Sequence, residues 1–212
     1  MQYSTLLFDL DDTLYESGNG LWDTIRNRMS KYMEVRLHIP VETIPTLREY
    51  YFKTYGTTLR GLQIHYGVDA DDYLKFVHDI PLGEYLHEDR ELRKLLNSLP
   101  QSKYVFTNAD ANHASRVLQV LGVESCMNGI IDVKALDFSC KPEIEAYEKA
   151  LQIAHVDHPD RCVYFDDIPA NLEPAKKLGV FTVLVGNSKH PSIAHRSIKR
   201  LLDLSDEFPE LW

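Results

Sequence analysis

The sequence predicts an α/β protein in which a parallel sheet carries helices on both faces and an all-helical segment is inserted near the start. Two observations support this prediction. After Pro81, short apolar runs alternate with helix-like stretches, which is typical of a parallel sheet covered by helices. Between Asp23 and Pro81, no stretch alternates like a strand. We therefore expect a core made of residues 1–16 and 82–212 and a helical insertion of residues 17–81.

The expected elements follow in chain order. Residues 3–8 form a buried strand that joins the later sheet, and Leu21, Ile25, Met29 and Met33 recur every four residues in a helix. Further helices of the insertion are expected at 47–55 and 70–78. In the core we expect helices at 89–99, 111–121, 142–155 and 169–179, and strands at 103–108, 129–133, 162–167 and 180–186. The basic stretch 187–200 is expected to be a solvated loop and helix.

Composition limits the classes of partner. The chain has 212 residues, of which 44% are hydrophobic and 26% charged, and its formal net charge is −9. This charge disfavours polymeric nucleic acid and anionic membranes, which both require clustered Lys and Arg. No stretch approaches the ~20 apolar residues that cross a bilayer. No targeting segment is recognised, and the three widely spaced cysteines favour reduced thiols, so we expect a cytoplasmic protein with no obligate protein partner.

Polar residues gather at the predicted strand ends, where parallel sheets bind ligands. These residues are Asp9 and Asp11, Thr107 and Asn108, Lys141, and Asp166, Asp167 and Asn171. Singly, each is typical of a turn, a helix cap or a solvated lysine. Their occurrence at four equivalent positions in one chain instead indicates a common site.

The acids at these positions suit phosphoryl transfer through a phosphoaspartate. Asp9 would be the nucleophile. Its approach to a phosphate is opposed by like charge, at about 4 kcal/mol for charges ~4 Å apart at an effective dielectric of 20. Mg²⁺ would remove that repulsion, bound by side-chain oxygens of Asp9 and Asp167 and by the backbone carbonyl of Asp11.

The remaining residues complete this chemistry. Asp11 suits a general acid and base that protonates the leaving alkoxide and then activates water. Thr107, with backbone amides near Asn108, would hold phosphoryl oxygens, and Lys141 would balance charge between nucleophile and phosphate. Asp166, together with Asn171, would orient Asp167 or a bound water without binding the metal directly.

These residues resemble the haloacid dehalogenase (HAD) superfamily of phosphotransferases. The matching motifs, in the family's order, are "DLDDT" (9–13), "TNAD" (107–110), "KPE" (141–143) and "YFDDIPANLEPAKKLG" (164–179). The resemblance implies a Rossmann-like, HAD-like core, dependence on Mg²⁺, and a helical cap inserted after the first motif. Aligning "FDDIPAN" with the family's commoner Gly-Asp form puts Asp167 rather than Asp166 on the metal.

Within the superfamily, "FDLDDTLY" and "YFKTYGTTLRGL" (51–62) resemble the pyrimidine 5′-nucleotidase group. This implies hydrolysis of UMP or CMP to nucleoside and phosphate, with Thr58 and Arg60 as substrate contacts from the cap. The alternative is that "TTLRGL" is a loop and helix start packed inside the cap. The aromatic residues Tyr50, Tyr51 and Tyr55 are expected in the core of the cap.

Three other functions stay open at this point. A sugar-phosphate or phosphoglycolate-type phosphatase would use the same residues. In a dehalogenase Asp9 would attack carbon, a reaction that needs neither the metal nor an acid at Asp11. A non-catalytic binding module would be expected to have lost Asp9, Asp11 or Lys141, and all three are present.

Overall fold

The computed structural model describes residues 2–187 and 193–212. The chain folds into two compact units. Unit 1 combines the N-terminal residues up to Ser17 with Leu86–Trp212, and unit 2 is Gly18–Tyr85. Among the described residues, no helix is both long and apolar enough to cross a bilayer.

Unit 1 is built on a parallel sheet of six strands in the order β3-β2-β1-β4-β5-β6. The strands are β1 (Thr5–Phe8), β2 (Ser102–Phe106), β3 (Gly129–Ile131), β4 (Cys162–Asp166), β5 (Phe181–Val185) and β6 (Arg196–Ile198). All four residues of β1 are buried, as expected for a central strand covered on both faces. The order changes direction at β1, which lies between β2 and β4, and such a switch point is where open α/β sheets place their ligands.

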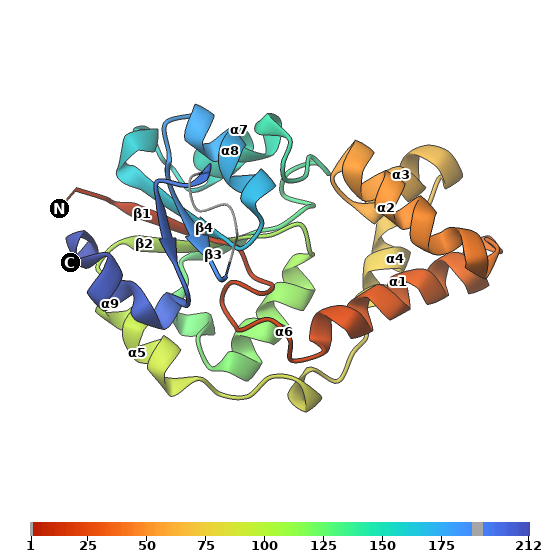
Figure 1. Cartoon of the computed structure of the whole chain (residues 1–212), viewed down its shortest axis with the longest axis horizontal. Helices are drawn as coiled ribbons and strands as arrows, with labels where there is room; N and C mark the ends of the chain where they lie inside the picture. The colour runs from red at the N-terminus through yellow and green to blue at the C-terminus, as the bar shows by residue number, and fades with distance from the viewer. Residues whose placement is uncertain (1, 188–192) are drawn as a thin grey trace. The chain divides into compact units, whose positions relative to one another are not determined.

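Helices cover both faces of this sheet. They are α5 (Arg90–Ser98), α6 (Ala111–Leu121), α7 (Ile144–Ile153), α8 (Pro169–Lys177) and the short α9 (Leu204–Glu207). Figure 1 shows α7 and α8 on one face and α5, α6 and α9 on the other. The sequence-based prediction of an α/β fold with a parallel sheet is therefore confirmed.

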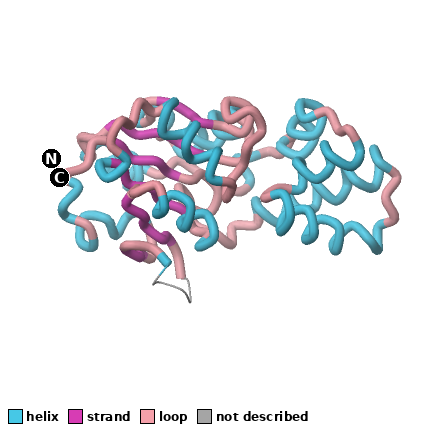
Figure 2. Tube along the Cα trace, turned by 90° about the horizontal axis from the view of Figure 1, so that it is seen from above, coloured by secondary structure: helices cyan, strands magenta, loops and turns pink. Residues whose placement is uncertain are grey.

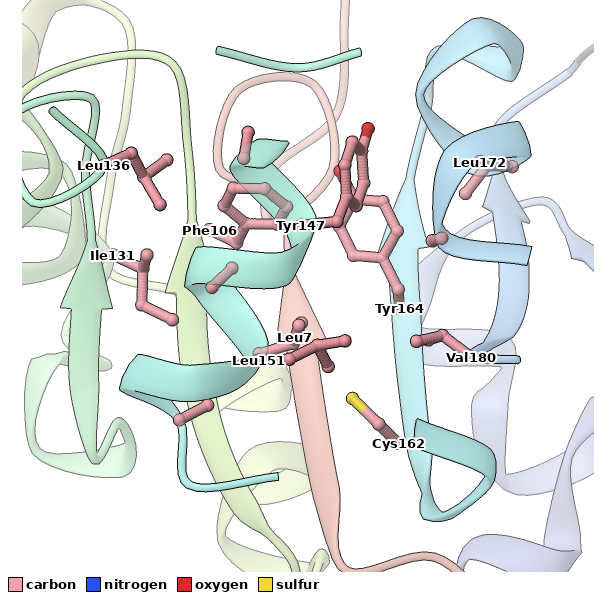
Figure 3. Packing of buried hydrophobic residues seen from close by; sticks show 14 of the residues in the cluster. Leu7, Phe106, Ile131, Leu136, Tyr147, Leu151, Cys162, Tyr164, Leu172 and Val180 are labelled. Carbon is pink, nitrogen blue, oxygen red and sulfur yellow. The ribbon is translucent and has the colours of Figure 1, made fainter. Parts of the chain in front are cut away.

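Apolar side chains fill the space between the sheet and α7–α8. Tyr147 of α7 packs on Phe106 and Tyr164 of the strands (Figure 3), and Ala150 of α7 and Leu172 of α8 belong to the same cluster. The ring centroids of Phe106 and Tyr147 lie 5.2 Å apart, and those of Tyr147 and Tyr164 lie 5.8 Å apart. Edge-on aromatic pairs at this spacing are favourable. This aromatic group lies near the carboxyl ends of β2 and β4.

Unit 2 consists of helices and loops only (Figure 2). Its helices are α1 (Leu21–Leu37), α2 (Ile44–Tyr55), α3 (Thr58–Tyr66) and α4 (Ala70–His78). A Cβ added at Gly61 of α3 would lie 2.2 Å from Cγ of Tyr51 in α2, so the two helices approach too closely for any side chain at this position. Gly61 weakens the helical pattern of the sequence, and a helix start at this position was expected only in the alternative interpretation of "TTLRGL".

Two further expectations change. The stretch 187–200 was predicted to be a loop and helix, but Arg196–Ile198 forms the edge strand β6, paired with β5; residues 188–192 lie outside the described part. Tyr51 is buried, as expected for a core residue of unit 2, whereas Tyr50 is half exposed. A three-residue strand is too short to show an alternating pattern, which explains why β6 was missed.

Candidate active site

The fold brings the predicted polar residues of unit 1 together at the carboxyl ends of the central strands. Asp9 follows β1, and its backbone N–H donates to the carbonyl of Phe165 in β4 at 2.8 Å. Asp166 is the last residue of β4, and Thr107 directly follows β2. Because β1 lies between these two strands, Asp9 stands between the residues that end its neighbours.

Lys141 joins two of the acids. Its Nζ lies 2.5 Å from Asp9 Oδ1 and 3.0 Å from Asp166 Oδ2, and it also donates to the carbonyl of Phe106 at 3.0 Å. The side chain is 2% exposed. Burial alone would lower the pKa of the ammonium, but Asp166 and Asp9 outweigh burial and hold the pKa above its ordinary value. Lys141 is therefore a fixed positive charge between two carboxylates.

The two acids at the end of β4 have different surroundings. Asp166 is fully buried, and its Oδ1 accepts hydrogen bonds from the Ile168 N–H at 2.8 Å and from Asn171 Nδ2 at 3.1 Å. Its Oδ2 accepts from Lys141, from Asn171 at 3.1 Å and from the Tyr164 hydroxyl. Asp167 is only partly buried. Asp166 thus has both oxygens filled by protein donors.

The aromatic core supports this arrangement from below. Tyr164, whose hydroxyl binds Asp166, is fully buried. The Tyr147 hydroxyl donates to the carbonyl of Asn171 at 2.6 Å, which fixes the backbone that carries the other Asp166 donor. The Lys141 ammonium lies 5.1 Å from the centroid of Phe106, a distance at which a cation is attracted to the ring. The sequence offered no indication of these tyrosines beyond their apolar pattern.

On the β2 side, Thr107 and Asn108 make contacts within the protein. The Ala109 N–H donates to Thr107 Oγ1 at 3.0 Å. Asn108 forms a reciprocal pair with the backbone of Lys141: its Oδ1 accepts from the Lys141 N–H at 2.8 Å and its Nδ2 donates to the Lys141 carbonyl at 3.0 Å. Asn108 thereby holds the segment that carries the lysine.

Asp11 lies two residues after Asp9 and has its own partners. The Tyr15 hydroxyl donates to Asp11 Oδ1 at 2.6 Å, and His113 Nε2 of α6 lies 3.4 Å from the same oxygen. Neither Tyr15 nor His113 was predicted from the sequence. Tyr15 stands four residues after Asp11, and His113 stands in the first turn of α6, so only the folded chain brings the histidine to the acid.

The acidic cluster has the donors that a hard divalent cation requires. Oxygens of Asp9, Asp166 and Asp167 all lie within 4.8 Å of one another. The Thr13 hydroxyl lies 3.5 Å from Asp9 Oδ2 and 3.4 Å from Asp167 Oδ1, so it spans the two acids. Three carboxylates facing one ammonium leave two negative charges in excess, which matches the charge of Mg²⁺, and carboxylate oxygens are its usual ligands.

Burial and the neighbouring acids both shift the pKa values of this cluster upward. Burial raises the pKa of Asp9 well above its ordinary value despite Lys141, and Asp166 and Asp167 raise it further. Burial, followed by the charge of Asp166, raises the pKa of Asp167 from 3.8 to about 7. A cation bound here would relieve this repulsion and restore both groups to their ionised forms.

The two predicted cap residues belong to unit 2. Thr58 and Arg60 lie in the first turn of α3, which Thr57 caps by accepting the Arg60 N–H at 3.1 Å. Thr58 is buried and Arg60 is partly exposed.

Comparison with known proteins gives the family. The model of the haloacid dehalogenase-like hydrolases matches residues 3–179. Phosphate metabolism protein 8 of Saccharomyces cerevisiae is 28% identical over 191 residues, covering 84% of this chain but only 60% of that protein's length.

Solved structures have the same fold. The HAD-hydrolase YfnB from Bacillus subtilis, solved with magnesium, is 17% identical with a TM-score of 0.65, and the match covers 97% of this chain and 98% of that one. The L-2-haloacid dehalogenase of Xanthobacter autotrophicus, with chloropropionic acid covalently bound, is 15% identical with a TM-score of 0.59 over 96% and 97% of the two chains. The family model covers all four motifs at the ends of the strands, and this chain belongs to the haloacid dehalogenase-like hydrolases.

Proposed function

We propose that this protein is a Mg²⁺-dependent phosphomonoesterase that forms an aspartyl phosphate on Asp9. The observation that carries the proposal is the charge arrangement around Asp9: one buried lysine against three clustered carboxylates. This arrangement suits a reaction in which a carboxylate must approach a phosphate. The relative from yeast is named for phosphate metabolism, which agrees with this class of substrate.

In the first half of the reaction, a carboxylate oxygen of Asp9 attacks phosphorus and the bond from phosphorus to the leaving oxygen breaks. Asp11 donates its proton to that oxygen, so that an alcohol leaves instead of an alkoxide. Lys141 offsets the negative charge shared by Asp9 and the phosphoryl group. Thr107 stands at the end of β2 and contributes to holding the phosphoryl oxygens.

In the second half, Asp11, now ionised, takes a proton from a water molecule that attacks the phosphorus of the aspartyl phosphate. The bond between phosphorus and the Asp9 oxygen breaks, which releases phosphate and regenerates the carboxylate. Asp11 recovers its proton in this step, so both halves use the same group.

The metal would be held by side-chain oxygens of Asp9 and Asp167 and by the backbone carbonyl of Asp11. When bound, Mg²⁺ neutralises the phosphate charge and polarises its oxygens. We assign to Asp166 the roles of holding Lys141 and ordering the site rather than binding the metal, because its oxygens already accept hydrogen bonds from protein donors. Asn171 supports Asp166 in this role.

The substrate class that we propose is a nucleoside monophosphate, with UMP and CMP preferred. This rests on the motif of unit 2 that contains Thr58 and Arg60 and resembles the pyrimidine 5′-nucleotidase group, and the location that we propose for the enzyme is the cytoplasm. Partly exposed Arg60 is suited to bind a polar part of the nucleotide. Sugar phosphates and phosphoglycolate are the alternative substrates.

A dehalogenase remains the second candidate, since the solved dehalogenase has the same fold. Its chemistry needs neither a metal nor a proton donor at Asp11. The acids at 167 and 11 therefore favour phosphoryl transfer.

The test is phosphate release from p-nitrophenyl phosphate. Wild-type protein should release phosphate with Mg²⁺, lose the activity in EDTA and recover it when Mg²⁺ is restored. Asp9→Asn should reduce turnover by several orders of magnitude, as loss of a covalent nucleophile does in other hydrolases. The control is Asp137→Asn, the same change at an exposed loop residue with φ of 53°, a conformation that Asn tolerates. Activity that persists in EDTA or in Asp9→Asn would overturn the proposal.

A further inference from the structure

We propose that Tyr15 and His113 are positioning residues that hold the Asp11 carboxyl in the orientation it needs to transfer protons. The inference rests on the proposed function, in which Asp11 is the general acid and base. His113 lies outside the motifs quoted above, and Tyr15 is the last residue of "FDLDDTLY", where the resemblance gave it no role. Both were found only through their contacts with Asp11 in the folded chain.

Both contacts fall on the same oxygen. Tyr15 Oη lies 2.6 Å from Asp11 Oδ1, a short distance that is typical of a hydroxyl donating to an ionised carboxylate. His113 Nε2 lies 3.4 Å from this oxygen and donates to it in the tautomer that carries hydrogen on Nε2. An oxygen that accepts these contacts is a poor site for a proton, so the proton that Asp11 transfers belongs on Oδ2.

The two donors are more deeply buried than the acid that they contact. His113 is fully buried and Tyr15 is 8% exposed, whereas the Asp11 side chain keeps 19% exposure. His113 is fixed in the first turn of α6, where its N–H donates to the capping carboxylate of Asp110 at 2.7 Å. One oxygen of the partly exposed Asp11 carboxyl is therefore held by two buried side chains.

The backbone brings Tyr15 into place. Asp12 has a φ of 60°, in the left-handed region, and the chain then turns so that the N–H groups of Thr13 and Leu14 both point to the carbonyl of Leu10, at 3.4 and 3.0 Å. This turn places Tyr15 back over Asp11, which lies four residues earlier. The contacts thus connect the loop after β1, which carries Asp9, to the first turn of α6, the helix that follows Thr107 in the chain.

The two donors matter most where a proton must reach the leaving group. An alcohol leaves with difficulty unless it is protonated, whereas p-nitrophenolate is a stable anion that needs little help from an acid. Disorienting Asp11 should therefore slow attack on alkyl phosphates much more than attack on p-nitrophenyl phosphate. A merely structural role would slow both to the same extent.

The experiment compares kcat/KM for benzyl phosphate and for p-nitrophenyl phosphate, with Mg²⁺ present. For each substrate, kcat/KM reports the steps up to loss of the leaving group and excludes later hydrolysis of the aspartyl phosphate. Tyr15→Phe removes only the hydroxyl, and His113→Leu removes only the imidazole donor. Each should lower kcat/KM on benzyl phosphate by about 10-fold or more, a fraction of the 10²–10⁴ that general acid catalysis supplies, and change it less than about 3-fold on p-nitrophenyl phosphate.

Two further variants serve as controls. His113→Gln retains an N–H donor near the position of Nε2 and should recover part of the activity on benzyl phosphate. Tyr3→Phe removes the hydroxyl of a buried tyrosine next to the amino end of β1, opposite the site, and should leave both substrates unaffected. If His113→Leu does not fold, the comparison of the two substrates with Tyr15→Phe alone tests the inference.

Equal losses on the two substrates, or no loss on benzyl phosphate, would overturn the inference. Wild-type protein that releases phosphate from neither substrate would instead overturn the proposed function, and the inference with it. The two failures are therefore distinguishable in a single set of assays.

Discussion

Replacing Lys141 by Met tests whether the site is held together by charge. The variant keeps the length of the side chain but removes the ammonium that lies 2.5 Å from Asp9 and 3.0 Å from Asp166. At an effective dielectric of 20, each contact is worth about 5–7 kcal/mol. The Met variant also avoids the free-energy cost of burying the ammonium, and this saving offsets most of the lost attraction. We expect a net loss of about 3–5 kcal/mol in the free energy of unfolding, the usual result of removing one partner from a buried ion pair.

The pH dependence of this loss identifies its cause. Lys141 is the group that lowers the pKa of Asp9 against burial, so removing it raises that pKa further. A carboxyl with a raised pKa in the folded state stabilises the protein below its unfolded pKa, and this contribution is lost as the pH rises through the folded pKa. The cost of Lys141→Met should therefore be largest near neutral pH and decrease in acid.

The assay is urea unfolding in EDTA, in a Trp22→Phe background so that Trp212 reports on unit 1. The control is Lys103→Met. Lys103 is also buried, but its Nζ donates to the carbonyls of Leu99 and Gln101, each at 2.8 Å. Its loss should cost about 1–3 kcal/mol. If the two variants lose the same stability with the same pH dependence, the charge argument for Lys141 is wrong.

Three other predictions concern unit 2, the acidic cluster and the substrate. Gly61→Ala would place a Cβ 2.2 Å from a ring carbon of α2 and should cost about 1–3 kcal/mol by urea unfolding, whereas Gly83→Ala, which meets nothing within 4 Å, should be close to neutral. The pKa of Asp167 is raised from 3.8 to about 7, so this carboxyl stabilises the metal-free protein below pH 3.8, and the free energy of unfolding should fall as the pH rises to about 7. Mg²⁺ should reduce the slope of unfolding free energy against pH. An unchanged slope would contradict the proposal that Asp167 binds the metal. Arg60→Ala should lower kcat/KM on UMP more than on p-nitrophenyl phosphate, and exposed Arg36→Ala should change neither; equal losses for Arg60→Ala would make that residue structural.

The fold was predictable because its strands are buried on both faces. β1, β2, β4 and β5 appear in the sequence as apolar runs, and parallel pairing follows from the helices between them. β6 has only three residues, including Arg196 and Ser197, and carries no such pattern. The helix α3 was expected only as a helix start in one of two alternatives, because its close packing against α2 requires a glycine in its interior.

The residues of the candidate site that lie at the ends of strands could be predicted from the sequence. Asp9, Lys141 and Asp166 were identified from sequence, and the structure brings them within hydrogen-bond distance of one another through the lysine. Tyr15 and His113 were not identified, because a tyrosine in a loop and a histidine in a helix are ordinary residues until the fold joins them. The contact between His113 and Asp11 spans 102 residues, and no local pattern encodes it.

The contacts of Asp166 explain why the proposed mechanism uses both a lysine and a metal. Its carboxylate is fully buried and accepts from Tyr164, Asn171 and the backbone, so its negative charge is fixed in place. That charge holds Lys141. It also adds to the effect of burial, which is the main cause of the raised pKa of Asp9 and of Asp167, and so disfavours the ionised forms that the proposed mechanism uses. A divalent cation beside Asp9 and Asp167 reverses this second effect without disturbing the first. In the proposed mechanism, the buried acid would therefore increase the affinity of the site for the cation, and a bound cation would favour the ionised form of Asp9.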